Sequence, residues 1–197
     1  MSRRILDLDM REIGTENRPK SGPCLYVANH QSAWEALACN VLIPDVCIVA
    51  KIELARIPVF GWFLRHAPMI LVDRAAGTKA LGKILKEARE ALAEGRSILI
   101  FPEGTRVRPG RHSRFQPGLA ALYRSLGVPV VPLAHDSGMF WTSGGKKPGR
   151  ITISYLAQLP AGLPPQEAMA LIEEAVNSEK DRLVGGWHLT SGDCGTC

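Results

Sequence analysis

Short apolar segments rich in branched residues recur along the whole chain. Most of them are almost continuously hydrophobic, which is typical of strands that are buried on both faces of a parallel sheet. A further segment, Leu8–Gly14, is predicted to be a strand ahead of the others. The six central segments that we predict to be strands are Cys24–Ala28, Val46–Ala50, Pro68–Val72, Ser97–Phe101, Val128–Ala134 and Ile151–Leu156.

Helical patterns lie between and after these strands. Thr78–Glu94 carries one apolar stripe, with Thr78 as the expected N-cap and Gly95 as the expected stop. A second helix is predicted from Pro165 to about Leu183, because Ala168, Leu171, Ile172, Ala175 and Val176 fall on one face. The alternation of strands and helices predicts an α/β fold: a single domain with a mostly parallel central β-sheet flanked by helices.

Composition narrows the class of protein. A chain of 197 residues, of which 46% are hydrophobic, can bury the core of one domain without disulfides or metal. We expect that domain to span residues 1–184 and the Gly-rich residues 185–197 to form a disordered tail. No apolar run approaches the roughly 18 residues of a membrane-spanning helix. Cysteines in apolar surroundings (Cys24, Cys39 and Cys47) indicate reduced core residues of a cytosolic protein.

Polar and charged residues follow five of the predicted strands. The carboxyl ends of parallel strands meet at one edge of a sheet, where α/β folds bind their ligands. The net charge of +5 favours an anionic partner. These residues therefore predict one anion-binding site, and they are Asn29–Ser32, Lys51, Asp73 and Arg74, Pro102–Arg106, and His135–Ser137.

Two of these segments carry specific chemistry. In the first, His30 precedes Glu35 by five residues, so a helix that begins after His30 would return the carboxylate to the imidazole. A carboxylate that holds one ring nitrogen leaves the other free as a general base. The alternative is a helix-start histidine with a surface glutamate. The second, Phe101–Arg106, turns at Gly104 and presents Arg106, which suits bidentate capture of phosphate; the alternative is a solvated β-turn.

Other motifs point elsewhere and are set aside. Gly77–Lys83 has phosphate-loop spacing, but Ile84 stands where Ser or Thr must follow, which favours an amphipathic helix. Neighbours in sequence cannot form a triad, so His135–Ser137 is not predicted to be one. Cys194 and Cys197 lack further zinc ligands. The arginines around Arg106–Arg114 have only Phe115 as an aromatic platform, so no nucleic-acid partner is predicted.

Together, these segments resemble the glycerolipid acyltransferase family, in particular the bacterial 1-acyl-glycerol-3-phosphate acyltransferases. Asn29, His30 and Glu35 match the first family motif, Asn-His-x4-Asp, except that Glu replaces the usual Asp. Phe101–Arg106 matches the third without change. Lys51–Arg74 is similar to the second motif and Val128–Pro132 to the fourth. The resemblance extends from about Ile5 to Leu183.

The resemblance implies a reaction and a set of roles. His30, oriented by Glu35, would deprotonate the sn-2 hydroxyl of lysophosphatidate, which then attacks acyl-CoA or acyl-carrier protein to give phosphatidate. Backbone N–H groups near the Asn29–Ser32 turn are candidates to bind the oxyanion. No metal or cofactor is implied. The residues that would bind the acceptor and its phosphate are Lys51, Arg74, Glu103, Gly104, Thr105 and Arg106.

Alternatives remain for the substrate and for the membrane. The acceptor could be another lyso-lipid, such as a lyso-ornithine lipid, or the chain could be a non-catalytic module that binds lipid or acyl-carrier protein. Family members usually carry apolar helices before the first motif, whereas only 29 residues precede His30 here. We therefore expect peripheral contact with an anionic membrane surface at the cytoplasmic face, or a truncated chain. The apolar stretch Ile57–Leu64, with Trp62 and Phe63, could supply core packing or interfacial contact.

Overall fold

The structure, a computed structural model, describes residues 7–57, 61–62, 66–142 and 144–191. One sheet contains seven strands in the order β1-β9-β6-β2-β5-β3-β4. Their bounds are β1 Leu8–Ile13, β2 Leu25–Ala28, β3 Val46–Lys51, β4 Met69–Val72, β5 Ser97–Ile100, β6 Val130–His135 and β9 Gly149–Tyr155. A separate hairpin consists of β7 Trp141–Thr142 and β8 Gly145–Lys146.

Five neighbouring strands, from β6 to β4, are parallel to one another. At one side of this group β9 runs antiparallel to β6, and β1 pairs with β9 in parallel. The carboxyl ends of the five parallel strands therefore meet at a single edge, as the sequence predicts. This arrangement confirms the α/β fold with a mostly parallel sheet.

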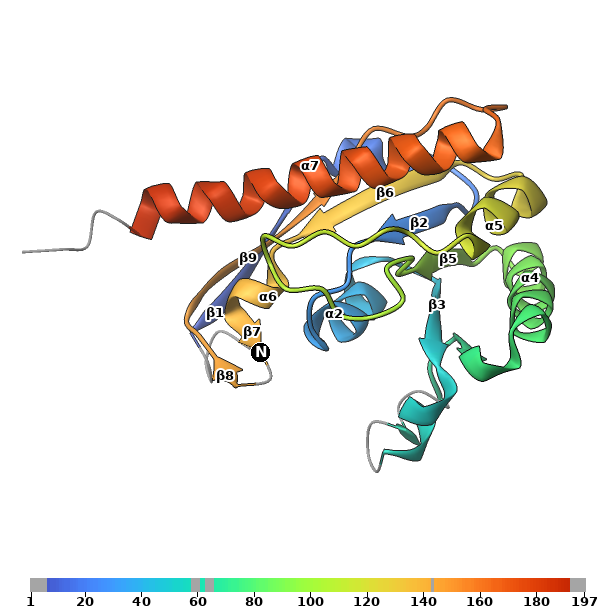
Figure 1. Cartoon of the computed structure of the whole chain (residues 1–197), viewed down its shortest axis with the longest axis horizontal. Coiled ribbons are helices and arrows are strands. Elements are labelled where there is room, and N and C mark those ends of the chain that lie inside the picture. Colours follow the sequence, from blue (N-terminus) through green and yellow to red (C-terminus); the bar gives the residue numbers. More distant parts are fainter. Residues whose placement is uncertain (1–6, 58–60, 63–65, 143, 192–197) are drawn as a thin grey trace, which may run out of the picture.

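Helices cover both faces of the sheet (Figure 1). The α-helices are α2 Trp34–Leu42, α4 Thr78–Ala93, α5 Gly118–Leu126, α6 Ser137–Phe140 and α7 Pro165–Ser191. Short 3-10 turns are η1 Thr15–Asn17, η2 Ile52–Arg56 and η3 Arg74–Ala76. Helix α7 lies along the sheet over β6 and packs against α5 (Figure 1).

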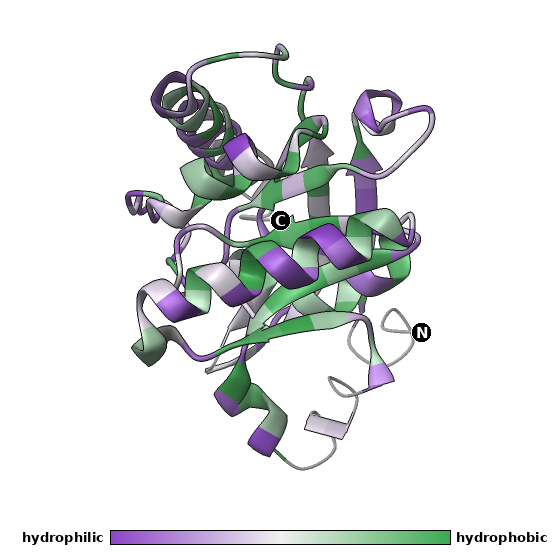
Figure 2. Cartoon of the chain, turned by 90° about the vertical axis from the view of Figure 1, so that its right-hand side faces the viewer, coloured by the Kyte–Doolittle hydropathy of each residue, from purple (hydrophilic) through white to green (hydrophobic). Residues whose placement is uncertain are grey.

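The two faces bury separate clusters because successive strand residues point to opposite sides. In β2, Tyr26 joins the cluster that contains Trp34 and Cys39 of α2, whereas Leu25 and Val27 join the cluster that contains residues of α4, α5 and α7. Figure 2 shows mostly hydrophobic strands, and helices that mix hydrophobic and hydrophilic residues. The side chains of the central strands are mostly apolar, so the polar groups that could form a site gather where these strands end.

Several expectations about elements need correction. Helix α7 continues to Ser191, so the disordered tail predicted from residue 185 is wrong for 185–191, while 192–197 lie outside the described residues. Glycines lower helix propensity but, unlike proline, keep the N–H donor, so two of them need not end a helix. Gly77, not Thr78, occupies the N-cap position of α4. Leu171, expected on the buried face of α7, is 41% exposed.

No helix within the described part of the chain is both long enough and apolar enough to cross a bilayer. The cysteines Cys24, Cys39 and Cys47 are free and buried, as expected. Cys194 and Cys197 lie outside the described residues.

Candidate active site

The loop between β2 and α2 carries the central residues of the site. Ser32 and Glu35 have the Ser-x-x-Glu spacing of a capping box, and Glu35 reaches back to accept the Ser32 N–H at 2.8 Å. The Ser32 hydroxyl in turn accepts the N–H of Trp34 at 3.1 Å. These bonds begin helix α2 and place a carboxylate in its first turn, where the helix dipole favours negative charge.

His30 and Glu35 form a hydrogen-bonded pair, as the sequence predicts. The Nδ1 atom of His30 lies 2.8 Å from Glu35 Oε1, and the two side chains are 20% and 0% exposed. The His30 ring also stacks beside Phe101, with 4.8 Å between ring centroids. Among the residues the structure describes, none bonds to His30 Nε2. With Nδ1–H donated to the carboxylate, Nε2 keeps its lone pair and can accept a proton.

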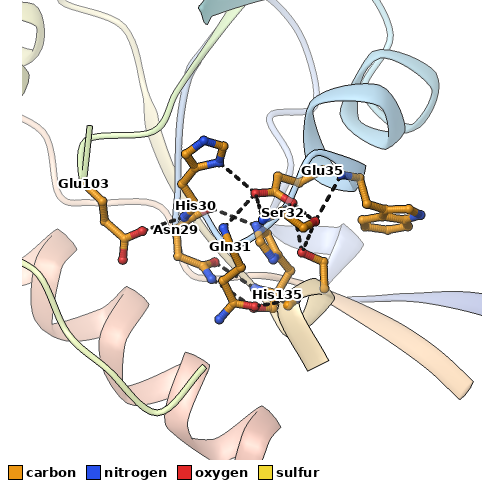
Figure 3. Close-up of polar contacts among 10 residues, drawn as sticks. Asn29, His30, Gln31, Ser32, Glu35, Glu103 and His135 are labelled. Carbon is orange, nitrogen blue, oxygen red and sulfur yellow. Dashed lines mark hydrogen bonds and ion pairs between the residues drawn. The ribbon is translucent and has the colours of Figure 1, made fainter. Parts of the chain in front are cut away.

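Glu35 is surrounded by hydrogen-bond donors (Figure 3). Its oxygens accept the Gln31 N–H at 2.8 Å and the Ser137 hydroxyl at 2.9 Å, besides the bonds from Ser32 and His30. Burial opposes ionisation, but the neighbouring His135 and His30 and the Ser32 hydrogen bond outweigh it and lower the pKa of Glu35. Glu35 is therefore a fixed negative charge behind the imidazole.

Ser137 is a residue whose role the sequence analysis missed. It belongs to the His135–Ser137 run that was set aside because neighbours cannot form a triad. The structure confirms that they form none, yet Ser137 supports Glu35 from α6, 102 residues away in sequence. The position of Ser137 directly after a buried strand was the available signal.

Asn29 and His135 fasten β2 to β6 beneath the pair. The Asn29 side chain accepts the His135 N–H at 2.9 Å and donates to the His135 carbonyl at 3.0 Å. His135 Nε2 donates to the Asn29 carbonyl at 2.8 Å, and burial lowers the pKa of this histidine. His135 thus ties the strand ends together and keeps the His30 loop in place.

Glu103 lies on the side of His30 opposite to Glu35 (Figure 3). Its Oε2 atom accepts the His30 backbone N–H at 2.7 Å, and its Oε1 atom lies 3.3 Å from Nζ of Lys180. Burial raises the pKa of Glu103, although the His30 N–H and Lys180 favour the ionised form. The side chain is 2% exposed, so the structure places Glu103 as a support of the His30 loop.

Backbone N–H groups near the Asn29–Ser32 turn were expected to bind the oxyanion, but three of them already donate to carboxylates. The His30 N–H bonds to Glu103, and the N–H groups of Gln31 and Ser32 bond to Glu35. That expectation is therefore wrong for these residues, because the buried carboxylates need the same donors.

The remaining predicted binding residues are Gly104, Thr105, Arg106, Lys51 and Arg74. Gly104 turns the chain with φ of 73°, a left-handed conformation that favours glycine, and the following loop returns to His30 through a 2.7 Å bond from the Val107 N–H to its carbonyl. Thr105 and Arg106 are exposed. Lys51 pairs with Glu53 at 3.3 Å, and for Arg74 only the backbone, in η3, is described.

A cavity of about 600 Å³ opens beside the site between β3, β4, β5 and the helices α4 and α5. Its polar part is formed by Thr78, Glu103, Thr105 and Gln116. Apolar side chains line the rest, including Val49, Val72, Leu81, Ile84, Ile100, Leu119 and Leu122. Such a cavity suits a flexible hydrocarbon group that enters next to the His30 loop. Within the described residues, no three His, Cys, Asp or Glu side chains gather as metal ligands.

Comparisons with known proteins find similar sequences and a similar fold. A family model described as Acyltransferase matches residues 9–136. The 1-acyl-sn-glycerol-3-phosphate acyltransferase of Pseudomonas aeruginosa is 39% identical over 71% of this chain and 55% of its own length. That of Helicobacter pylori is 34% identical over 66% and 54%, respectively.

The crystal structure of the 1-acyl-sn-glycerophosphate (LPA) acyltransferase PlsC from Thermotoga maritima is also similar. It superposes with a TM-score of 0.74 at 27% identity, over 90% of this chain and 73% of that one. The chain spans about half the length of the curated bacterial relatives it matches.

Proposed function

The chain belongs to the Acyltransferase family, and from this we propose that it transfers a fatty acyl group from acyl-CoA or acyl-carrier protein to the sn-2 hydroxyl of lysophosphatidate, giving phosphatidate. The observation that carries the proposal is the His30–Glu35 pair, which has a free Nε2 and stands beside an apolar cavity. The similar proteins of Pseudomonas aeruginosa and Helicobacter pylori are 1-acyl-sn-glycerol-3-phosphate acyltransferases, which favours this acceptor.

The site suits direct transfer between the two substrates. His30 Nε2 takes the proton of the acceptor hydroxyl as its oxygen attacks the thioester carbonyl. Glu35 stabilises the imidazolium that forms. The tetrahedral intermediate then collapses: the carbon–sulfur bond breaks, and the imidazolium returns the proton to the departing thiolate. No nucleophile from the protein, metal or cofactor takes part in this scheme.

The test of the proposal is a transfer assay with matched acceptors. We expect transfer to lysophosphatidate and much less to a lyso-ornithine lipid or a monoacylglycerol of the same chain length.

Arg106→Ala removes a charge-assisted contact worth about 1.5–3 kcal/mol, so the acceptor KM should rise about tenfold or more. Arg150→Ala, which removes an exposed arginine paired with Asp9, is the control. If only the donor KM changes, Arg106 binds the donor; equal use of all acceptors contradicts the phosphate site.

We propose that the cavity holds the acyl chain during transfer. Leu81→Trp should fill part of it and shorten the longest chain that the site accepts. Each methylene kept out of apolar contact costs about 0.8 kcal/mol, so excluding two should lower kcat/KM about tenfold. The measurement compares kcat/KM for C16 and C8 donors, with Leu171→Trp, at an exposed position, as control. If the ratio of kcat/KM for the two donors is unchanged, the acyl chain does not occupy this cavity.

Peripheral binding to an anionic membrane at the cytoplasmic face is also part of the proposal. Three large apolar side chains around η2 are exposed, namely Ile52 at 39%, Ile57 at 48% and Trp62 at 60%. Phe63, which the sequence also suggested, lies outside the described residues. We expect the protein to sediment with anionic vesicles and to dissociate as salt rises, because screening acts over roughly 8–10 Å. Trp62→Ala should weaken binding more than Leu171→Ala; binding that ignores lipid charge and salt would contradict this surface.

A further inference from the structure

Lys180 is a fully buried lysine, with 0% of its side chain exposed. It lies outside the residues 9–136 that the family model matches. Lysine is almost never buried in this way unless it is paired, because removing an ammonium group from water is costly. Its position therefore requires an explanation in terms of its partner.

The sequence of α7 places Lys180 on the core side of the helix. Ala168, Ile172 and Val176 are all 0% exposed and follow one another at intervals of four residues. The next position in this series is Lys180, and Leu183 continues the stripe at 8% exposure. An apolar residue at this position would pack equally well against the core. The packing of α7 therefore does not explain the charge, and a contact with another element must.

That contact is Glu103. Lys180 Nζ lies 3.3 Å from Glu103 Oε1, and the other oxygen, Oε2, accepts the His30 N–H at 2.7 Å. The chain of contacts joins α7 to the loop after β5 and then to the backbone of the proton acceptor. Figure 3 shows Glu103 and Glu35 approaching His30 from opposite sides, one at its backbone and one at its ring.

We propose that Lys180 is a positioning residue for acyl transfer, which keeps Glu103 ionised so that this carboxylate holds the His30 loop. The proposal rests on the proposed function. An ionised carboxylate accepts a backbone N–H more strongly than a neutral acid does. Without this bond, His30 loses one of the contacts that align its ring with Glu35 and the substrate.

The charged groups around this contact come from several elements. Glu103 faces His30 and Lys180, while the nearby His135 faces Glu35, His30 and Lys180. Lys180 is thus the single lysine or arginine among these groups, beside two carboxylates and two histidines. Removing it leaves burial to favour the protonated form of Glu103, so the pKa of this group should rise further.

The test is the pH dependence of kcat in Lys180→Met. We expect the acid limb of the profile to move upward by about one pH unit or more, so that kcat falls about tenfold on that limb and recovers at higher pH. Substrate KM values should change much less, because Lys180 does not line the cavity. Lys180→Arg should restore the wild-type profile. Arg182→Met, which removes an exposed cation from the same helix, should leave it unchanged.

A double variant identifies the titrating group. In Lys180→Met/Glu103→Gln the amide oxygen can still accept the His30 N–H, and no carboxyl remains to titrate. We expect the double variant to lack the upward shift of the acid limb that Lys180→Met produces. We also expect its kcat to exceed that of Glu103→Gln alone, because in that single variant the buried lysine is left with a neutral partner. This comparison also holds if Lys180→Met does not fold. An unchanged profile in folded Lys180→Met, or a double variant less active than Glu103→Gln, would overturn the proposal.

A second readout separates this inference from the proposed function. The amide resonance of His30 in ¹⁵N-labelled protein should titrate with Glu103, and Lys180→Met should move that titration to higher pH, whatever the substrate. If the wild-type protein transfers no acyl group, but Lys180→Met shifts the titration of the His30 amide resonance, the proposed reaction is wrong and the contacts from Lys180 through Glu103 to His30 are supported. If transfer occurs and neither limb nor resonance moves, the role of Lys180 is wrong.

Discussion

His30→Ala is expected to abolish acyl transfer while leaving the fold intact. The imidazole is the group that takes the proton in the proposed reaction, and losing a general base costs about 10²–10⁴ in rate. The side chain is 20% exposed at the end of β2 and is not part of the hydrophobic clusters. Glu35 keeps its bonds from the Gln31 and Ser32 N–H groups, so its buried charge remains solvated by the protein.

The measurement is kcat together with the thermal unfolding midpoint of the same preparation. His112→Ala is a matched control, because this exposed histidine also pairs with a carboxylate, that of Asp181. It should keep the wild-type rate. A folded His30→Ala protein with more than a tenth of the wild-type kcat would show that another group accepts the proton.

Glu35→Gln should give the second largest loss, on the order of 10²-fold or more in kcat with little change in KM. The amide oxygen can still accept from His30 Nδ1, but a neutral amide does not stabilise the imidazolium. The amide NH₂ would also face the hydroxyls of Ser32 and Ser137, which now donate to Glu35 Oε2. Glu167→Gln, an exposed site in the first turn of α7, is the control.

Glu35→Asp tests the difference from the common family motif. Aspartate is shorter by one methylene, so it can reach His30 only if the loop or the start of α2 moves. We expect it to retain more activity than Glu35→Gln, because it keeps the charge. If the kcat of Glu35→Asp is no higher than that of Glu35→Gln, the distance between the carboxylate and His30 matters more than the charge. Since the pKa of Glu35 is lowered, acid should not protonate it within the working range, and the acid limb must come from other groups.

Local patterns predicted the seven strands of the sheet and the helices α4 and α7, but not α5, α6 or the β7–β8 hairpin. Near-continuous runs such as Leu25–Ala28 and Ser97–Ile100 are strands because both faces of the sheet are covered, and the resulting alternation of strands and helices specifies the parallel architecture. The His30–Glu35 pair was also predictable, because the two residues are joined by a short turn and the Ser32-x-x-Glu35 spacing starts a helix. Over such short distances the backbone geometry alone decides which atoms meet.

The support of the site depended on contacts between distant segments. Ser137 meets Glu35 across 102 residues, and Lys180 meets Glu103 across 77. The motif predicts that Glu103 binds substrate, and the structure adds that this side chain is buried against the His30 backbone and a lysine of α7. The spacing of residues along the sequence does not predict where α7 crosses the sheet or which strand ends lie next to each other. Those contacts arise only when packing brings the partners together. They supply the hydrogen-bond donor and the opposite charge that a buried carboxylate needs, because an unpaired charge in that interior would be too costly.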